Sequence, residues 1–403
     1  MCHECTEDQD ATTGSILVDE VIGASGTPSV LMIHGPGAGL DRRGLRTPAP
    51  RTRARLEAWC AGWAQAHGWR ADARWCGDEA ELVAAVRGAS ADALVVVPGD
   101  LAFTSVALAE AVAAVRAPVV ELHLRDLRRQ GHDPASGLGR VARRLHGRGA
   151  DGYRDAIDHV AHAAAWPPET AAIGEGTEQV VDVRVPEGAG PHPTVLLLHG
   201  GFWLDAWGRD LCDGIAVDLV RRGVATINAE YRRQHTGTWD DTARDLLAAA
   251  DWLGTNAVAR RLDRDRVAVA GHSAGGQLAH WLARQLVASG RAPHLVVGLA
   301  PLMDLAGARE EGLGGDAVAA FFGDGPLDDQ DPLSNLPLGL PQLLVHALDD
   351  TLVPPEATAS YAAAAHEAGD TVRFLQPPAG HFEVIDPRGD AWRQVADRII
   401  EML

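Results

Sequence analysis

The chain has 403 residues, of which 46% are hydrophobic and 23% are charged, and its formal net charge is −19. This length accommodates two hydrophobic cores of ordinary size, and the strong negative charge disfavours nucleic acid or an anionic membrane as a partner. No apolar run reaches the roughly 18 residues of a membrane span, and the polar start lacks the regions of a signal peptide. We therefore expect a cytoplasmic protein with two domains.

The five cysteines, at positions 2, 5, 60, 76 and 212, are odd in number and widely scattered. Such a set is typical of reduced thiols in a reducing compartment. The first pair lies in Cys2-His3-Glu4-Cys5, which has no matching second pair of zinc ligands. We interpret residues 1–28 as an N-terminal tail and expect no metal site.

Strands and helices are predicted to alternate from Ser29 to about residue 160. The pattern predicts strands at 30–33, 94–97 and 119–124, and helices at 56–67 and 105–115. This alternation favours a parallel sheet with helices on both faces and with any ligand at the loops that follow the strands. We therefore expect an α/β protein whose first domain, residues 29–166, is flavodoxin-like.

Several segments of this domain resemble type II 3-dehydroquinate dehydratase, over residues 29–161. They are Gly35-Pro36, Arg46-Thr47-Pro48, Pro98-Gly99 and residues 104–108, 118–124 and 149–154. The resemblance implies a ligand site at Arg46, Ser105, Glu121 and His123. It also implies the trimers and dodecamers of that family, so we expect a homo-oligomer formed through this domain.

The chain departs from this family at the positions that carry the chemistry. The family uses a lid tyrosine as base, yet residues 37–60 contain no tyrosine. Val97, Phe103 and Arg125 stand where the family has an asparagine, a histidine and a serine. Loss of a positioned base costs about 10²- to 10⁴-fold in rate, so we expect that the dehydratase activity is lost. The alternatives for this domain are a retained lyase activity or a role as a ligand-sensing module. Its arginine-rich residues 42–55 are expected to form either an anion-binding lid or a solvated loop.

A short connection separates the two domains. Pro167 and Pro168 end the preceding helix, and the Gly and Thr residues that follow mark an extended segment. We place a linker at residues 167–177 and a second domain at residues 178–403.

The second domain contains Gly271-His272-Ser273-Ala274-Gly275, a Gly-x-Ser-x-Gly run between an apolar strand and a predicted helix. This pattern predicts a sharp strand-to-helix turn that carries Ser273 as a nucleophile. Upstream, residues 199–203 read His-Gly-Gly-Phe-Trp after another strand. Glycines at 200 and 201 leave main-chain N–H groups accessible, so we predict an oxyanion hole there, with Phe202 and Ala274 as donors.

A base and an acid are predicted further along the chain. Asp350 follows a strand at 341–348, and His381 follows a strand at 371–375, which gives the order serine, acid, histidine. Asp349 and Asp304 are alternative acids. We predict Ser273, Asp350 and His381 as the catalytic triad.

Residues 178–403 resemble the α/β-hydrolases, in the branch of kynurenine (aryl) formamidases and related small esterases. The resemblance is carried by residues 199–203, 230–233, 271–276 and 380–382. It implies an acyl-enzyme on Ser273, cleavage of a small ester or an aryl formamide such as N-formylkynurenine, and no cofactor. Residues 312–337 are expected to form a lid, and Phe202, Trp203 and Trp207 either line its pocket or belong to the core.

Overall fold

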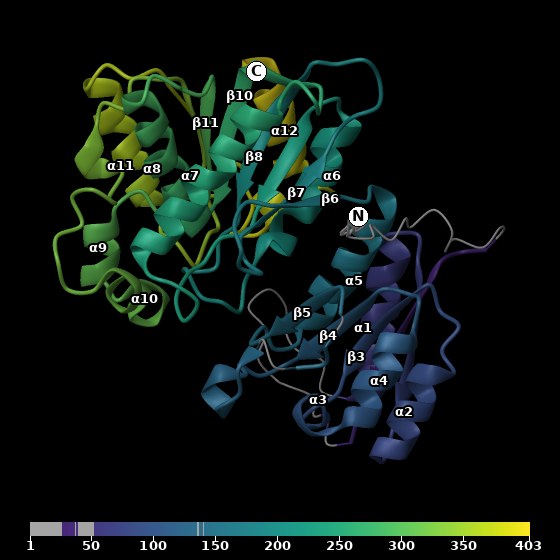
Figure 1. Cartoon of the computed structure of the whole chain (residues 1–403). Coiled ribbons are helices and arrows are strands. Elements are labelled where there is room, and N and C mark those ends of the chain that lie inside the picture. The colour runs from purple at the N-terminus through teal and green to yellow at the C-terminus, as the bar shows by residue number, and fades with distance from the viewer. Residues whose placement is uncertain (1–25, 37, 39–51, 135–136, 140) are drawn as a thin grey trace, which may run out of the picture.

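The computed structural model describes residues 26–36, 38, 52–134, 137–139 and 141–403, which form two β-sheets flanked by helices (Figure 1). Several predictions fall wholly or largely outside this part of the chain: the N-terminal tail with its Cys2–Cys5 run, Arg46, and the arginine-rich residues 42–55. None of the helices in the described ranges has both the length and the apolar character needed to cross a membrane.

The first sheet has five parallel strands in the order β2-β1-β3-β4-β5. The strands are β1 (Ser29–His34), β2 (Arg70–Trp75), β3 (Ala93–Val97), β4 (Val119–His123) and β5 (Arg143–His146). This is the strand order of flavodoxin-like sheets, so the predicted fold of this region is confirmed. Strands β3 and β4 are buried at every position, as expected of parallel strands that are covered on both faces.

Helices cover both faces of this sheet. They are α1 (Arg53–Ala66), α2 (Glu79–Arg87), α3 (Leu101–Thr104), α4 (Val106–Ala114) and α5 (Asp151–Ala165), with a 3₁₀ turn, η2 (Arg128–Gln130). Helices α1 and α5 share one apolar cluster with the sheet, and α2 and α4 share the other. Polar caps set two of the starts, because Asp78 accepts from the N–H of Glu81 and Ser105 accepts from the N–H of Leu108.

The second sheet has eight strands in the order β13-β12-β11-β10-β8-β9-β7-β6, parallel except where β7 pairs with β9 and β6. The strands are β6 (Glu169–Ala172), β7 (Val180–Arg184), β8 (His192–Leu198), β9 (Ala225–Ala229), β10 (Leu262–His272), β11 (Leu295–Leu299), β12 (Gln342–Val345) and β13 (Val372–Leu375). Strand β6 lies inside the segment that we predicted as a linker. Its residues are mostly exposed, so no apolar alternation indicated a strand.

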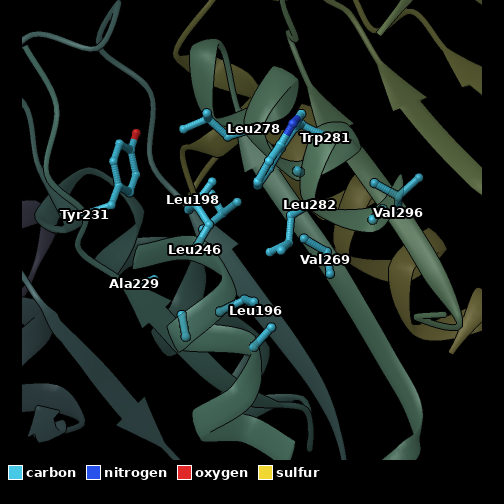
Figure 2. Close-up of a cluster of buried hydrophobic side chains, with 14 of the residues drawn as sticks. Leu196, Leu198, Ala229, Tyr231, Leu246, Val269, Leu278, Trp281, Leu282 and Val296 are labelled. Atoms are coloured by element: carbon cyan, nitrogen blue, oxygen red, sulfur yellow. The ribbon is translucent and has the colours of Figure 1, made fainter. Parts of the chain in front are cut away.

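The helices of the second sheet again lie on two faces. They are α6 (Asp213–Arg221), α7 (Trp239–Asn256), α8 (Ala274–Ala288), α9 (Leu305–Glu310), α10 (Leu313–Phe322), α11 (Pro355–Glu367) and α12 (Asp390–Met402), with 3₁₀ turns η4 (Arg209–Cys212), η5 (Leu333–Asn335) and η6 (Glu383–Ile385). Figure 2 shows the core in which α7 and α8 pack on β8, β9, β10 and β11. Helices α6 and α12 cover the opposite face. The cap of α7 is Thr238, which exchanges hydrogen bonds with Asp241.

Helix α5 joins the two parts of the molecule, because it packs beside α6 (Figure 1). His159 Nδ1 lies 3.1 Å from Asp213 Oδ2, and Arg154 Nη2 donates to Asp386 Oδ2 at 3.4 Å. The start of α5 carries residues on which our expectation of a homo-oligomer was based. Helix α5 contacts α6 of the second domain within the same chain. Assembly through the N-terminal domain stays a prediction.

His34 makes the stability of the first domain sensitive to pH. It is fully buried at the end of β1, its ring stacks on Trp75 at 3.7 Å between centroids, and its Nε2 lies 3.0 Å from the Tyr153 hydroxyl. Burial lowers the pKa of His34 to about 4. The unfolded chain therefore binds a proton that the folded chain excludes, and stability is lost as the pH falls from about 6.5 toward about 4.

We predict that replacing His34 with glutamine removes this part of the pH dependence. Between pH 7 and pH 5 the wild-type chain should lose about 2 kcal/mol more of its unfolding free energy than H34Q does. Urea unfolding at the two pH values measures the difference, and H366Q, at an exposed position of α11, is the control. Equal pH dependence in wild type and H34Q would contradict the prediction.

Candidate active site

Ser273 lies on a sharp turn between β10 and α8. Its backbone has φ 56° and ψ −123°, an unusual conformation for a residue with a side chain, and it is 2% exposed. A Cβ on Gly275 would overlap the carbonyl oxygen of Leu198, so only glycine lets the turn approach β8 this closely. The turn places the positive N-terminal end of α8 directly behind the serine.

Asp350 and His381 meet at the ends of neighbouring strands β12 and β13. His381 Nδ1 donates to Asp350 Oδ2 at 2.6 Å, and both side chains are buried. The alternative acids serve elsewhere, since the Asp349 residue is exposed and Asp304 accepts from the N–H of Gly307 at the start of α9. Of the three candidates, Asp350 is thus the carboxylate in contact with the histidine.

The Asp350 carboxylate is held in its charged form. Its other oxygen accepts from the N–H groups of Leu352 at 2.8 Å and Val353 at 3.0 Å, and His346 Nε2 lies 3.1 Å from Oδ2. Burial alone would raise the pKa of Asp350, but hydrogen bonds from His346, His381 and the backbone lower it far below its usual range. The acid is therefore ionised at neutral pH.

His272 fastens the loop of His381 to the serine turn. Its Nε2 donates to the carbonyl oxygen of His381 at 2.9 Å, and the two rings lie 4.7 Å apart between centroids. Because His272 directly precedes Ser273, this bond keeps the histidine loop beside the nucleophile.

The His-Gly-Gly segment after β8 passes against the same turn. A Cβ on Gly200 would lie 2.6 Å from the carbonyl oxygen of His272 and 2.8 Å from Ser273 Cβ. Phe202 and Trp203 follow with positive φ values of 51° and 56°. Residues with side chains rarely adopt this left-handed conformation, which is usual only for glycine. The surrounding structure therefore imposes the shape of this loop.

A buried charged group holds this loop in place. His199 Nε2 lies 2.9 Å from Glu230 Oε1, its Nδ1 lies 2.8 Å from the carbonyl oxygen of Gly200, and Tyr231 donates to the His199 carbonyl oxygen at 2.6 Å. Burial raises the pKa of Glu230, but Arg233, His199 and other neighbours bring it well below its usual value. A fixed negative charge thus lies beneath the loop.

The aromatic residues predicted to line a pocket have different surroundings. Trp203 is fully buried and stacks on Phe321 at 5.7 Å, so it belongs to the core. Phe202 lies against Gly314, at the start of α10. Residues 312–337, expected as a lid, thus place α10 against the predicted oxyanion loop.

The structure brings together only part of the predicted N-terminal site. His123 Nε2 donates to Glu121 Oε1 at 2.7 Å, and Arg144 Nε donates to its other oxygen at 2.7 Å. Phe103 stacks over His123 at 5.7 Å between centroids. Ser105 instead caps α4 and donates to Glu79 Oε1 at 2.5 Å.

Several residues that shape the site, notably His346 and Glu230, had no predicted role. The position of His346 at the end of a buried strand, four residues before Asp350, is the one local signal that pointed to it. Glu230 belongs to a segment that carried a family resemblance, but its contact with His199 spans 31 positions of the chain. Such long-range pairs have no local signature.

Comparison with known proteins identifies the first region. Residues 28–161 match the family model of class II dehydroquinases. The 3-dehydroquinate dehydratase 2 of Pseudomonas putida is 35% identical over 144 residues, which are 33% of this chain and 93% of that protein. A 3-dehydroquinate dehydratase 1 of Bradyrhizobium diazoefficiens is 32% identical over 151 residues, 36% of this chain and 96% of that protein. Through this region, the chain belongs to the class II dehydroquinase family.

The second region has the fold of α/β-hydrolases. Residues 181–288 match the BD-FAE family model. The ethyl acetate hydrolase of Pseudomonas putida is 38% identical over 116 residues, 27% of this chain, and the match spans 35% of that protein's length. A bacterial heroin esterase has a TM-score of 0.52 at 22% identity and covers 63% of this chain and 90% of its own. Carboxyl esterase 2 of the fungus Tuber melanosporum has a TM-score of 0.51 at 18% identity, and the match covers 59% of this chain and 87% of that protein. The chain thus combines a dehydroquinase-family domain with a domain that has the α/β-hydrolase fold.

We predict that Gly200→Ala impairs the hydrolase while leaving the fold intact. The new Cβ would press on His272 and Ser273, and a displacement of that size costs about 10²-fold in the rate of ester hydrolysis. Steady-state kinetics on p-nitrophenyl acetate measure the loss. Gly254→Ala is the matched control, because a Cβ at that position of α7 meets no atom within 4 Å. Wild-type kcat/KM in G200A would show that the loop does not need this close approach.

Proposed function

We propose that the second domain is a serine esterase that cleaves small carboxylic esters through an acyl-enzyme on Ser273. The observation that carries the proposal is the 2.6 Å bond between His381 and Asp350 in a loop that His272 ties to the serine turn. A strained serine turn, a buried acid–histidine pair and a glycine-bearing loop against the turn are the parts that acyl transfer requires.

In the proposed reaction, Ser273 Oγ attacks the ester carbonyl while His381 Nε2 accepts the serine proton. Asp350 holds the Nδ1–H of His381 and stabilises the imidazolium that forms. The N–H groups of Phe202 and Ala274 receive the negative charge on the carbonyl oxygen. His381 then gives its proton to the departing alcohol, and water activated by the same histidine hydrolyses the acyl-enzyme.

An ester is a better-supported substrate than an aryl formamide. The formamidase resemblance rested partly on residues 230–233, yet this segment serves to hold the loop. Glu230 contacts His199, and Arg233 donates to the carbonyl oxygens of Leu204 and Tyr231. Residues with these contacts carry no information about the acyl group, whereas the curated hydrolase and the solved structures similar to this domain are named as an ethyl acetate hydrolase and esterases.

We expect Ser273→Ala to lower kcat for p-nitrophenyl acetate by about 10⁴-fold or more, because the nucleophile is lost. Ser289→Ala, at the other end of α8, is the control and should retain wild-type activity. A panel of acetate esters, quinate esters and N-formylkynurenine compares the substrate classes, with short esters expected to have the highest kcat/KM. Wild-type rates in S273A would defeat the proposal, and a preference for N-formylkynurenine would restore the formamidase interpretation.

The family membership of the first domain favours a second candidate activity, dehydration of 3-dehydroquinate. We propose that this domain does not catalyse it, because residues 37–60 contain no tyrosine to act as the base and Phe103 stacks on His123. Incubation of the full chain with 3-dehydroquinate should produce no enone absorbance above the uncatalysed rate. A steady increase that persists in S273A would show a working lyase.

A further inference from the structure

We propose that the dehydroquinase-family domain positions the oxyanion loop of the hydrolase domain, with Arg148 as the principal positioning residue. The inference rests on the proposed esterase function and adds a role for the first domain. The loop concerned, called here the docking segment, comprises residues 199–210, from the His-Gly-Gly run to η4.

Arg148 reaches from the first domain into the docking segment. It lies between β5 and α5, its side chain is 1% exposed, and it makes three kinds of contact there. Its Nε donates to the carbonyl oxygen of Ala206 at 2.8 Å, its Nη1 donates to Asp210 at 2.6 Å, and its guanidinium lies 4.6 Å from the centroid of the Trp207 ring. The first domain therefore fixes both the backbone and two side chains of the segment.

Trp207 connects Arg148 to the reaction site. A Cβ on Gly201 would overlap Trp207, so the tryptophan packs directly on the backbone of the predicted oxyanion hole. Trp207 also stacks on Phe382 at 5.9 Å between centroids, and Phe382 directly follows His381. One indole thus touches the glycine loop and the histidine loop while a guanidinium from the other domain contacts its ring.

Arg143, in β5, provides a second route to the same loop. Its Nη2 donates to Asp210 at 2.5 Å, and its Nη1 donates at 3.3 Å to Glu230, the carboxylate that holds His199. Burial raises the pKa of Asp210, but Arg143 and Arg148 lower it far below its usual range. The carboxylate that both arginines share is consequently always charged.

Another contact between the domains provides a comparison. Arg388 of the hydrolase domain stacks on Trp63 of the first domain at 4.0 Å, and it bonds to Asp386. Neither Trp63 nor Asp386 belongs to the docking segment. Loss of Arg388 should therefore weaken the junction without moving the oxyanion loop.

The experiment compares Arg148→Met, Arg148→Lys and Arg388→Met in the full chain. We expect R148M to lower kcat for p-nitrophenyl acetate by about 10- to 10²-fold with KM changed less than about threefold, because a misplaced oxyanion hole weakens transition-state binding. The affinity for a phenylboronic acid, which forms a tetrahedral adduct with the serine, should fall by the same factor as kcat/KM. R148K keeps the positive charge but cannot both stack on Trp207 and bond to Ala206 and Asp210, so its kcat should be intermediate. R388M should keep the wild-type kcat per titrated active site.

Other outcomes overturn the inference. If R148M or R148K unfolds at lower temperature but retains wild-type kcat and boronate affinity, Arg148 only holds the domains together. If R148M does not fold, R148K decides by the same two readouts. If R388M loses as much kcat as R148M, the effect belongs to the junction as a whole. Activity in S273A would instead refute the esterase proposal, which separates the two failures.

Discussion

The site depends on a close approach of two backbones, at the carboxyl ends of the adjacent strands β8 and β10. Gly200 and Gly275 leave no room for a side chain where the loop after β8 meets the serine turn. The approach brings the loop after β8 directly against Ser273. Because the turn and the loop have strained dihedral angles, neither would hold this shape in isolation. The rest of the structure supplies the restraint.

Much of that restraint comes from buried ion pairs. These pairs serve mainly to position the loop and add little to the stability of the fold. A buried ion pair contributes roughly as much stability as well-packed apolar side chains would, whereas removing one partner costs about 3–5 kcal/mol. Asp210 and Glu230 are both held by arginines of the first domain and are nearly inaccessible. Stability alone does not require charges at this junction. Their directional bonds allow one docking arrangement, and that arrangement determines where the loop after β8 lies.

The sequence predicted those parts of the fold and site that have local signatures. Apolar runs gave the central strands, and the Gly-x-Ser-x-Gly turn, the strand before Asp350 and the loop of His381 were recognisable by spacing. Strand β6 was not predicted, because an exposed edge strand lacks the alternation of apolar and polar residues. His346 and the partners of Glu230 escaped because pairs that are distant in the chain meet only after folding. The sequence also favoured Asp350 over Asp304 and Asp349, and Asp350 is the carboxylate that His381 contacts.

The first domain shows how a fold can change its use. In doubly wound parallel sheets, ligands bind at the loops that follow the carboxyl ends of the strands. Here the loops after β4 and β5 contact the second domain instead, through the pair Arg128–Asp205 and through Arg148. Glu121 remains buried in a complete set of bonds from its own domain. Part of the edge that would receive a small molecule thus receives a loop of the hydrolase, and the residues that fix this loop lie outside the inherited site.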